Sequence, residues 1–192
     1  MTWQTLEMEL SGVSPLLLHN GQTADPLNEY SKEMKKVSSK RNKTEADLIY
    51  LAKLEFMASV YLDKEGSIVI PSQMIEALFV NGAKRTKQGK QAQAGFLCLE
   101  NPLLRFDGED LDIEQLWERD QNRFTMAVKV QRNKVMRTRF IAEEWSLNFT
   151  TQYNDDHFSA ADISQIFETS GMNVGLGDWR PKYGRFVSEV VQ

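Results

Sequence analysis

Residues 171–186 bring together side chains and backbone that could hold a nucleic acid. Four of the chain's 11 glycines lie here: Gly171, Gly175, Gly177 and Gly184. Glycine adopts positive φ and lets a phosphate or another backbone come close, and consecutive N–H groups in such a loop can cradle an anion. Cationic and ring side chains follow, namely Trp179, Arg180, Lys182, Tyr183 and Arg185. The segment therefore predicts contacts with phosphates and stacked bases.

A structural interpretation of the same segment is a tight turn with aromatic rings that pack in the core. For Gly171 alone we prefer that interpretation, because a glycine commonly ends a helix. A P-loop or dinucleotide loop is excluded, since Gly175 and Gly177 lie near a helix end and no Gly-Lys-Ser/Thr follows.

Basic residues gather in four clusters, within residues 32–43, 84–90, 132–139 and 180–185. A single cluster is most simply a solvated surface, but four that line one groove would neutralise several phosphates. Besides the segment above, the predicted nucleic-acid contacts are Lys40, Arg41, Lys43, Lys84, Arg85, Lys87, Lys90, Arg132, Lys134, Arg137 and Arg139.

The formal net charge of −4 does not by itself favour nucleic-acid binding. Residues 107–120 hold seven acids and one arginine, so the other residues carry a small positive excess. This acidic segment is either a solvated loop or a surface that binds a basic face on a neighbouring copy. Complementary patches on one chain would give open, heterologous assemblies.

Few other residues suggest chemistry. The single cysteine, Cys98, sits in an apolar run and is expected to be buried and inert, which excludes a disulfide framework and a Cys-rich metal site. His157 follows two aspartates, but this stretch is more typical of a turn that leads into a helix. The sequence shows no recognisable Ser/His/Asp or Cys/His catalytic set, so we expect no catalytic residue, no metal site and no cofactor.

The first ten residues alternate acidic and apolar types and have neither a basic start nor an apolar run, so no signal peptide is predicted. No stretch approaches the roughly 18 apolar residues that a membrane span needs. We therefore expect a cytoplasmic protein with no membrane contact.

Periodicity predicts the elements that position these residues. Alternation over 5–13 and 145–152 indicates half-buried strands, and 95–106 and 184–191 are also predicted strands. Capped, helically spaced apolar residues predict helices over 72–83 and 159–170. The order is βαββαβ, an α+β, modified ferredoxin-like fold. We expect one domain, 1–192, with insertions at about 20–70, partly helical, and 107–142, an acidic segment plus a β-excursion.

These features together resemble the RAMP (repeat-associated mysterious protein) superfamily. Gly175-Leu-Gly177, a basic stretch and then Tyr183-Gly184-Arg185-Phe186 match its glycine-rich loop before the last strand. Ile70-Pro71-Ser72 is similar to the segment that opens the first helix in RAMP backbone subunits, without their glycine. The first strand also runs into Gly12-Val13-Ser14.

The resemblance implies an RNA-recognition-type fold that binds RNA or single-stranded DNA and assembles head-to-tail with other copies, as in CRISPR effector backbones, with further effector-complex subunits as partners. A stand-alone or viral relative fits equally well. The family also includes ribonucleases, for which His19, as general base, and Asp25, in the loop after the first strand, would be the candidates. The alternatives to a non-catalytic binder are such a ribonuclease and a protein-only assembly subunit.

Overall fold

The computed structural model describes residues 2–191 and groups the chain into two compact units. Unit 1 comprises residues 1–17, 62–109 and 142–192, and unit 2 comprises residues 18–61 and 110–141. The predicted insertions, about 20–70 and 107–142, overlap unit 2 closely, while both ends of the predicted domain 1–192 lie outside the described residues. That these units act as one domain remains a prediction.

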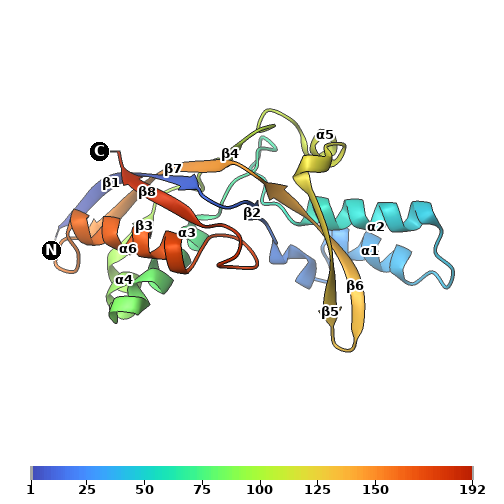
Figure 1. The fold of residues 1–192 in the computed structure, drawn as a ribbon, viewed down its shortest axis with the longest axis horizontal. Helices are drawn as coiled ribbons and strands as arrows, with labels where there is room; N and C mark the ends of the chain where they lie inside the picture. Colours follow the sequence, from blue (N-terminus) through green and yellow to red (C-terminus); the bar gives the residue numbers. More distant parts are fainter. Residues whose placement is uncertain (1, 192) are drawn as a thin grey trace. The chain divides into compact units, whose positions relative to one another are not determined.

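Unit 1 is built on an antiparallel sheet whose strands run in the order β3-β7-β1-β8 (Figure 1). Its strands are β1 (Trp3–Gly12), β3 (Phe96–Cys98), β7 (Trp145–Asn154) and β8 (Phe186–Val190), and the short β4 (Arg105–Phe106) also pairs with β7. Helix α3 (Ser72–Ala83) joins β1 to β3, and α6 (Ala160–Asn173) joins β7 to β8. This is a βαββαβ arrangement, so the predicted α+β, ferredoxin-like class is confirmed.

Strict alternation decides which face of the sheet is buried. On β1 the side chains of Leu6, Met8 and Leu10 are buried, and on β7 those of Leu147 and Phe149 are. Helices α3 and α6 cover this face, where Phe79, Phe96 and Phe167 form an aromatic cluster. The other face of the sheet carries the polar residues of both strands and has no helix in unit 1 over it (Figure 1).

Helix α6 continues past the glycine at which the sequence predicted its end. Gly171 is a buried helical residue, and a Cβ there would lie 2.1 Å from the carbonyl oxygen of Phe186. Its role is thus to let α6 approach β8. The left-handed residue after the helix is Gly175, with φ of 76°, and its N–H donates to the Ser170 carbonyl. The predicted stop was therefore four residues too early.

The predicted strand over 95–106 is two short strands with a detour between them. Pro102 and Leu104 exchange backbone hydrogen bonds with Ile70 and Ile68, at 2.9 Å each, and this pairing draws the intervening residues away from β7. Before β3 the basic stretch is structured as a 3-10 turn, η2 (Lys84–Thr86), and the short helix α4 (Gly89–Gly95). The short strand β2 (Leu16–Leu17) follows β1.

Unit 2 pairs a helical hairpin with a β-hairpin. Its elements are η1 (Gly21–Ala24), α1 (Glu29–Ser38), α2 (Glu45–Ala58), α5 (Ile113–Trp117), η3 (Asp120–Asn122), β5 (Arg123–Val130) and β6 (Asn133–Ala142). A capping box formed by Thr44 and Asp47 begins α2, within the insertion that the sequence predicted to be partly helical. Phe56 packs against the rings of Trp117 and Phe140 at centroid distances of 5.5 and 6.1 Å, so the core of the unit joins α2, α5 and β6.

Among the residues the structure describes, none of the helices has both the length and the apolar character that a membrane crossing requires.

Candidate nucleic-acid interface

The open face of the unit 1 sheet is acidic. Glu7 and Glu9 project from β1, and Glu9 lies directly opposite Glu189 of β8. A shallow hollow of about 350 Å³ on this face is lined in part by Glu7, Glu9, Glu100 and Asn148. Like charges opposite each other destabilise a sheet and would repel phosphates. The residues that stack RNA bases on the sheets of RNA-recognition folds are aromatic. On β1 this face carries one exposed ring, Trp3, at the end of the strand away from Glu9.

In the glycine-rich segment, where the sequence predicted a backbone cradle, several N–H groups are engaged by the protein itself. The N–H groups of Leu176, Tyr183 and Gly184 donate to carbonyls of the protein, and those of Asp178 and Arg185 donate to Leu17 and to the Ser14 hydroxyl. The N–H groups of Leu176 and Tyr183 bond within the loop, and those of Asp178, Gly184 and Arg185 dock it onto residues 13–17. The glycines permit that docking, since a Cβ at Gly177 would lie 2.4 Å from the Leu17 oxygen.

The side chains of this loop remain candidates. Arg180, Lys182 and Arg185 are exposed, whereas Trp179 and Tyr183 are half-buried and lie 6.3 Å apart between ring centroids. The ammonium of Lys182 sits 5.7 Å from the Tyr183 ring. The loop therefore offers charge on its surface, and its binding role stays a prediction that depends on these side chains.

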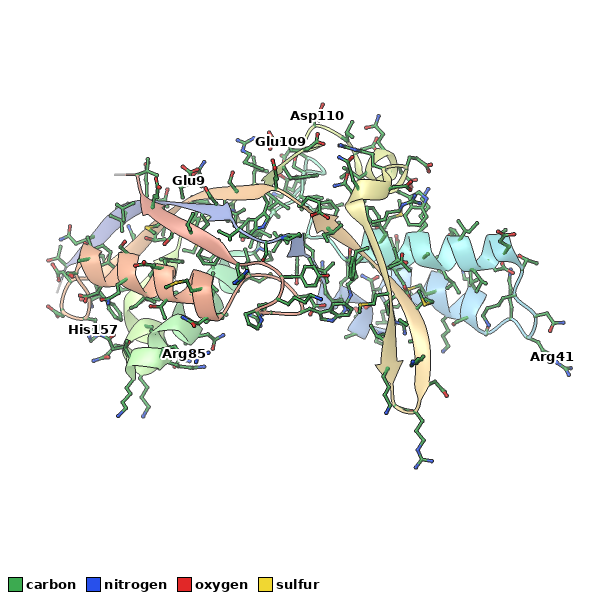
Figure 2. The ribbon with its side chains drawn as sticks, viewed as in Figure 1. Glu9, Arg41, Arg85, Glu109, Asp110 and His157 are labelled. Carbon is green, nitrogen blue, oxygen red and sulfur yellow. The ribbon has the colours of Figure 1, made fainter. Side chains whose placement is uncertain are left out.

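The second cluster surrounds a concave surface. Lys84, Lys87 and Lys90 line a hollow of about 540 Å³ together with Gln91 and Gln93, and no acid lines it. Gly89 makes room for the Lys84 stem, because a Cβ there would lie 2.7 Å from Lys84 Cγ. Arg85 extends into solvent from the side of unit 1 opposite to Glu9 (Figure 2).

The second and fourth clusters each follow the end of a helix, and these two helices, α3 and α6, cross close to those ends. A Cβ on Gly82 of α3 would lie 2.0 Å from the Ser170 hydroxyl of α6, so the two helices touch at this point. Lys84 begins the second cluster two residues after Gly82, and the loop that carries the fourth begins four residues after Ser170. The second cluster then leads into β3, which joins the sheet level with Gln4, whereas the fourth leads into β8 opposite Gly12. The two clusters therefore diverge from the crossing toward opposite ends of β1.

The third cluster lies on the β5–β6 hairpin of unit 2. Arg132 is at its tip, and Lys134 lies directly opposite Lys129, a cation that the sequence reasoning did not select. The hairpin register identifies Lys129, because it places this residue directly across from Lys134. Like charges in such a pair repel each other, and a bound anion would remove that repulsion. Arg137 and Arg139 lie nearer the base, where the Arg137 guanidinium pairs with Glu55 at 2.7 Å.

The first cluster is partly engaged within unit 2. Lys40 forms an ion pair with Asp47, and this hydrogen bond, with others from Thr44, lowers the pKa of the Asp47 carboxyl to about 2. The Lys43 ammonium donates to the Lys40 carbonyl oxygen, and Arg41 extends from the loop into solvent (Figure 2). This loop thus presents Arg41 and Lys43 more openly than Lys40.

The acidic segment is used in part by nearby bases. Glu114 pairs with Lys53 and Asp120 with Arg123, and Asp112 caps α5. Its surface nevertheless stays acidic, because Glu109 and Asp110 are exposed (Figure 2). A role for it in pairing with another copy remains a prediction.

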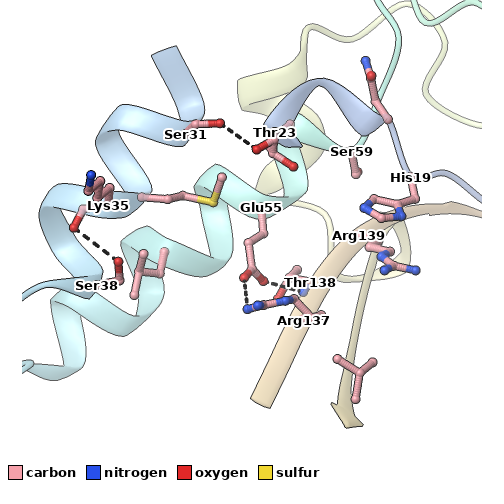
Figure 3. Close-up of a pocket in the computed structure, with 15 residues that line it drawn as sticks. His19, Thr23, Ser31, Lys35, Ser38, Glu55, Ser59, Arg137, Thr138 and Arg139 are labelled. Atoms are coloured by element: carbon pink, nitrogen blue, oxygen red, sulfur yellow. Dashed lines mark hydrogen bonds and ion pairs between the residues drawn. The ribbon is translucent and has the colours of Figure 1, made fainter. Parts of the chain in front are cut away.

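A pocket of about 620 Å³ in unit 2 holds one of the two catalytic candidates (Figure 3). His19 lies at its mouth beside Arg139, and partial burial followed by the charges of Arg139 and Arg137 lowers the pKa of its imidazole. Asp25 does not line this pocket; its carboxylate accepts the Leu27 N–H at 2.8 Å in an exposed turn. The structure therefore does not bring His19 and Asp25 together there, and within residues 2–191 no cluster of potential metal ligands occurs.

Cys98 is buried, as expected, and its thiol donates to the Glu100 carbonyl. Burial raises the pKa of this thiol to about 12 from an ordinary 9.0. Because only the thiolate reacts, we expect iodoacetamide to modify native Cys98 at pH 8 about 10³-fold more slowly than the urea-unfolded chain. Equal rates in the native and unfolded chains would contradict this burial.

Comparisons with known proteins show a likeness in fold alone. No protein-family model matches the sequence, and no curated protein matches it. A solved structure that it resembles is a chain in the cryo-EM structure of the Type III-B Cmr-beta bound to cognate target RNA, with a TM-score of 0.51 and 12% sequence identity. The match covers 99% of this chain and 59% of that one, so this chain spans about three fifths of its neighbour's length.

Proposed function

We propose that the protein is a RAMP-type, non-catalytic subunit that binds RNA, or another single-stranded nucleic acid, in the cytoplasm. It assembles head-to-tail along its ligand with other copies and with further effector-complex subunits, as in a CRISPR effector backbone. The nucleic acid contacts side chains of the basic clusters, and neither a cofactor nor a membrane takes part.

The division of charge within unit 1 carries this proposal. The open sheet face presents Glu7, Glu9 and Glu189, whereas exposed cations follow the helical layer at Lys84–Lys90 and in the loop with Arg180 and Lys182. A phosphate chain is attracted to one side of the unit and repelled from the other. The fold likeness supports the choice of ligand, because the neighbouring structure is bound to target RNA.

The same division supports assembly of copies. One copy carries both an acidic face and a basic face, and such unlike patches join copies in an open, heterologous series. In a protein-only assembly, the acidic and basic faces would join the copies without any bound nucleic acid. Oligomers that persist unchanged after nuclease treatment, in a preparation with the absorbance ratio of pure protein, would favour that alternative.

The first test of the proposal is the salt dependence of binding. We expect affinity for single-stranded RNA to fall steeply with salt, with a log–log slope of about −0.7 per phosphate neutralised, and to vary little with sequence. Fluorescence anisotropy with labelled oligonucleotides of several sequences measures both. A salt-independent affinity, or none at low salt, would reject the proposal.

A RAMP-type ribonuclease is the second candidate, and the position of His19 beside Arg139 favours it. Labelled RNA incubated with the protein, with and without divalent metal, tests this alternative. Cleavage that disappears in His19→Ala would support it. No cleavage, or cleavage that persists in both His19→Ala and Asp25→Ala, would end it.

A further inference from the structure

The lining of the unit 2 pocket carries an excess of positive charge. Lys35, Arg137 and Arg139 line it together with one carboxylate, Glu55. Glu55 accepts from the Arg137 guanidinium at 2.7 Å and from the Thr138 N–H at 2.9 Å, so both of its oxygens already serve β6 (Figure 3). Figure 3 shows Arg137 beside Glu55 and Arg139 beside His19, while Lys35 lies on the α1 side of the pocket.

Burial adds to the cost of this arrangement. Arg139 is half-buried, and desolvation lowers its pKa; Glu55 acts in the opposite direction and Arg137 in the same direction. Burial, and then the charges of Arg139 and Arg137, lower the pKa of the His19 imidazole at the mouth of the pocket. Cations that converge in a partly desolvated hollow are stabilised when an anion enters and accepts their hydrogen bonds.

The hydroxyls of the pocket are mostly occupied as donors. Ser31 donates to the Thr23 carbonyl at 2.9 Å, Ser38 to the Lys35 carbonyl at 3.2 Å and Ser59 to the Phe56 carbonyl at 2.6 Å. Recognition must therefore come from guanidinium, ammonium and imidazole groups, which suit a phosphoryl group better than a neutral sugar.

Part of the remaining lining is apolar, and the volume suits a small ligand. Met34, Leu51 and Val128 contribute to the wall, and about 620 Å³ lies within the range of small-molecule sites. An apolar wall beside a cationic one matches a base or ribose attached to a phosphate. The ligand class that fits is thus a nucleotide.

We propose that this pocket binds the phosphoryl group of a nucleotide through Arg139, Arg137 and His19. The inference rests on the proposed function for its choice of ligand. The phosphate belongs either to a free or terminal nucleotide or to the backbone of a bound strand, and both share the chemistry that the pocket recognises.

Proton NMR of the full chain tests this proposal, because the chain has two histidines and His157→Gln assigns their signals. An anion beside the imidazole favours its charged form. We therefore expect uridine monophosphate to move the titration midpoint of His19 to higher pH, while the His157 signal, which comes from unit 1, stays in place.

The source of the phosphate is read from two oligonucleotides. A response of His19 to 5′-phosphorylated RNA but not to 5′-hydroxyl RNA assigns a terminal phosphate, and a response to both assigns a backbone phosphate. No response to monophosphate or to either oligonucleotide overturns the inference. Anisotropy on the same samples keeps the two proposals distinct: strand binding without a His19 response overturns the pocket alone, and a His19 response to monophosphate without strand binding overturns the proposed function alone.

Variants locate the site. Arg139→Gln should weaken monophosphate binding about 10–100-fold, the worth of a hydrogen bond to a charged group. Arg137→Gln, at a more exposed position, is the second variant should Arg139→Gln fail to fold. Lys36→Gln is the matched control, since Lys36 is next to Lys35 on α1 but does not line the pocket. Unchanged affinity in a folded Arg139→Gln or Arg137→Gln, or equal weakening by Lys36→Gln, would remove the pocket from the site.

Discussion

Replacing Arg180, Lys182 and Arg185 together with glutamine should weaken binding to single-stranded RNA about 100-fold at 0.1 M salt. All three side chains are exposed on the loop before β8. Each phosphate contact contributes about 0.7 to the salt slope for single strands, so the loss of three should flatten that slope by about 2. Anisotropy titrations at several salt concentrations measure both quantities.

A control with the same change of net charge separates position from charge. Thr5→Glu, Leu97→Glu and Ser146→Glu together also lower the net charge by three, but these residues lie on the acidic open face of the sheet, and none of them is directly opposite another acid. We expect this variant to bind RNA nearly as the parent does, with an unchanged slope. Equal losses in both triple variants would mean that only net charge matters, and unchanged affinity in the glutamine variant would remove the loop from the interface.

The sequence predicted the core of the fold because local patterns there agree with the tertiary structure. Strict alternation in 5–13 matches β1, and the Ser159–Asp162 capping box begins α6 where it was expected. The same alternation already separated Glu7 and Glu9 from the buried residues of β1. The alternation could not predict that Glu189 lies opposite Glu9, because that pair depends on the register between β1 and β8.

The glycine-rich segment shows why the site was harder to predict than the fold. Glycine leaves room for whatever approaches it, and the sequence does not say whether that is a phosphate or the protein's own backbone. Here the approaching atoms are the oxygens of Leu17, Leu176 and Phe186. The sequence did predict that the cations of this segment are exposed, because charged side chains rarely lie buried without partners.

The pocket in unit 2 could not be predicted, since its residues come from four separate parts of the chain. His19 follows β2, Lys35 is on α1, Glu55 is on α2, and Arg137 and Arg139 are on β6. The sequence assigned these arginines to an open groove and His19 to a possible cleavage site. Only the folded chain shows that they line one hollow, which is why a phosphoryl site emerges from the structure alone.

Gly184→Ala should be the most destabilising single change considered for the loop that carries Arg180 and Lys182. Gly184 has φ of 72°, and a Cβ there would lie 1.8 Å from the carbonyl oxygen of Leu176, which is backbone and cannot rotate away. A left-handed residue costs about 1–2 kcal/mol without glycine, and overpacking adds about 1–3 kcal/mol. We therefore expect a loss of about 2–5 kcal/mol in the free energy of unfolding, measured by urea titration.

Two other glycines separate these contributions. Gly66 also has positive φ, at 89°, but nothing lies within 4 Å of its Cβ position, so Gly66→Ala should show the backbone cost alone. Gly21→Ala meets neither restriction and should leave stability nearly unchanged. If Gly184→Ala proved no worse than Gly66→Ala, the tight packing of Gly184 against residue 176 would be wrong. The loop would then be free to open, and its N–H groups could bind an anion after all, because docking is what now occupies them.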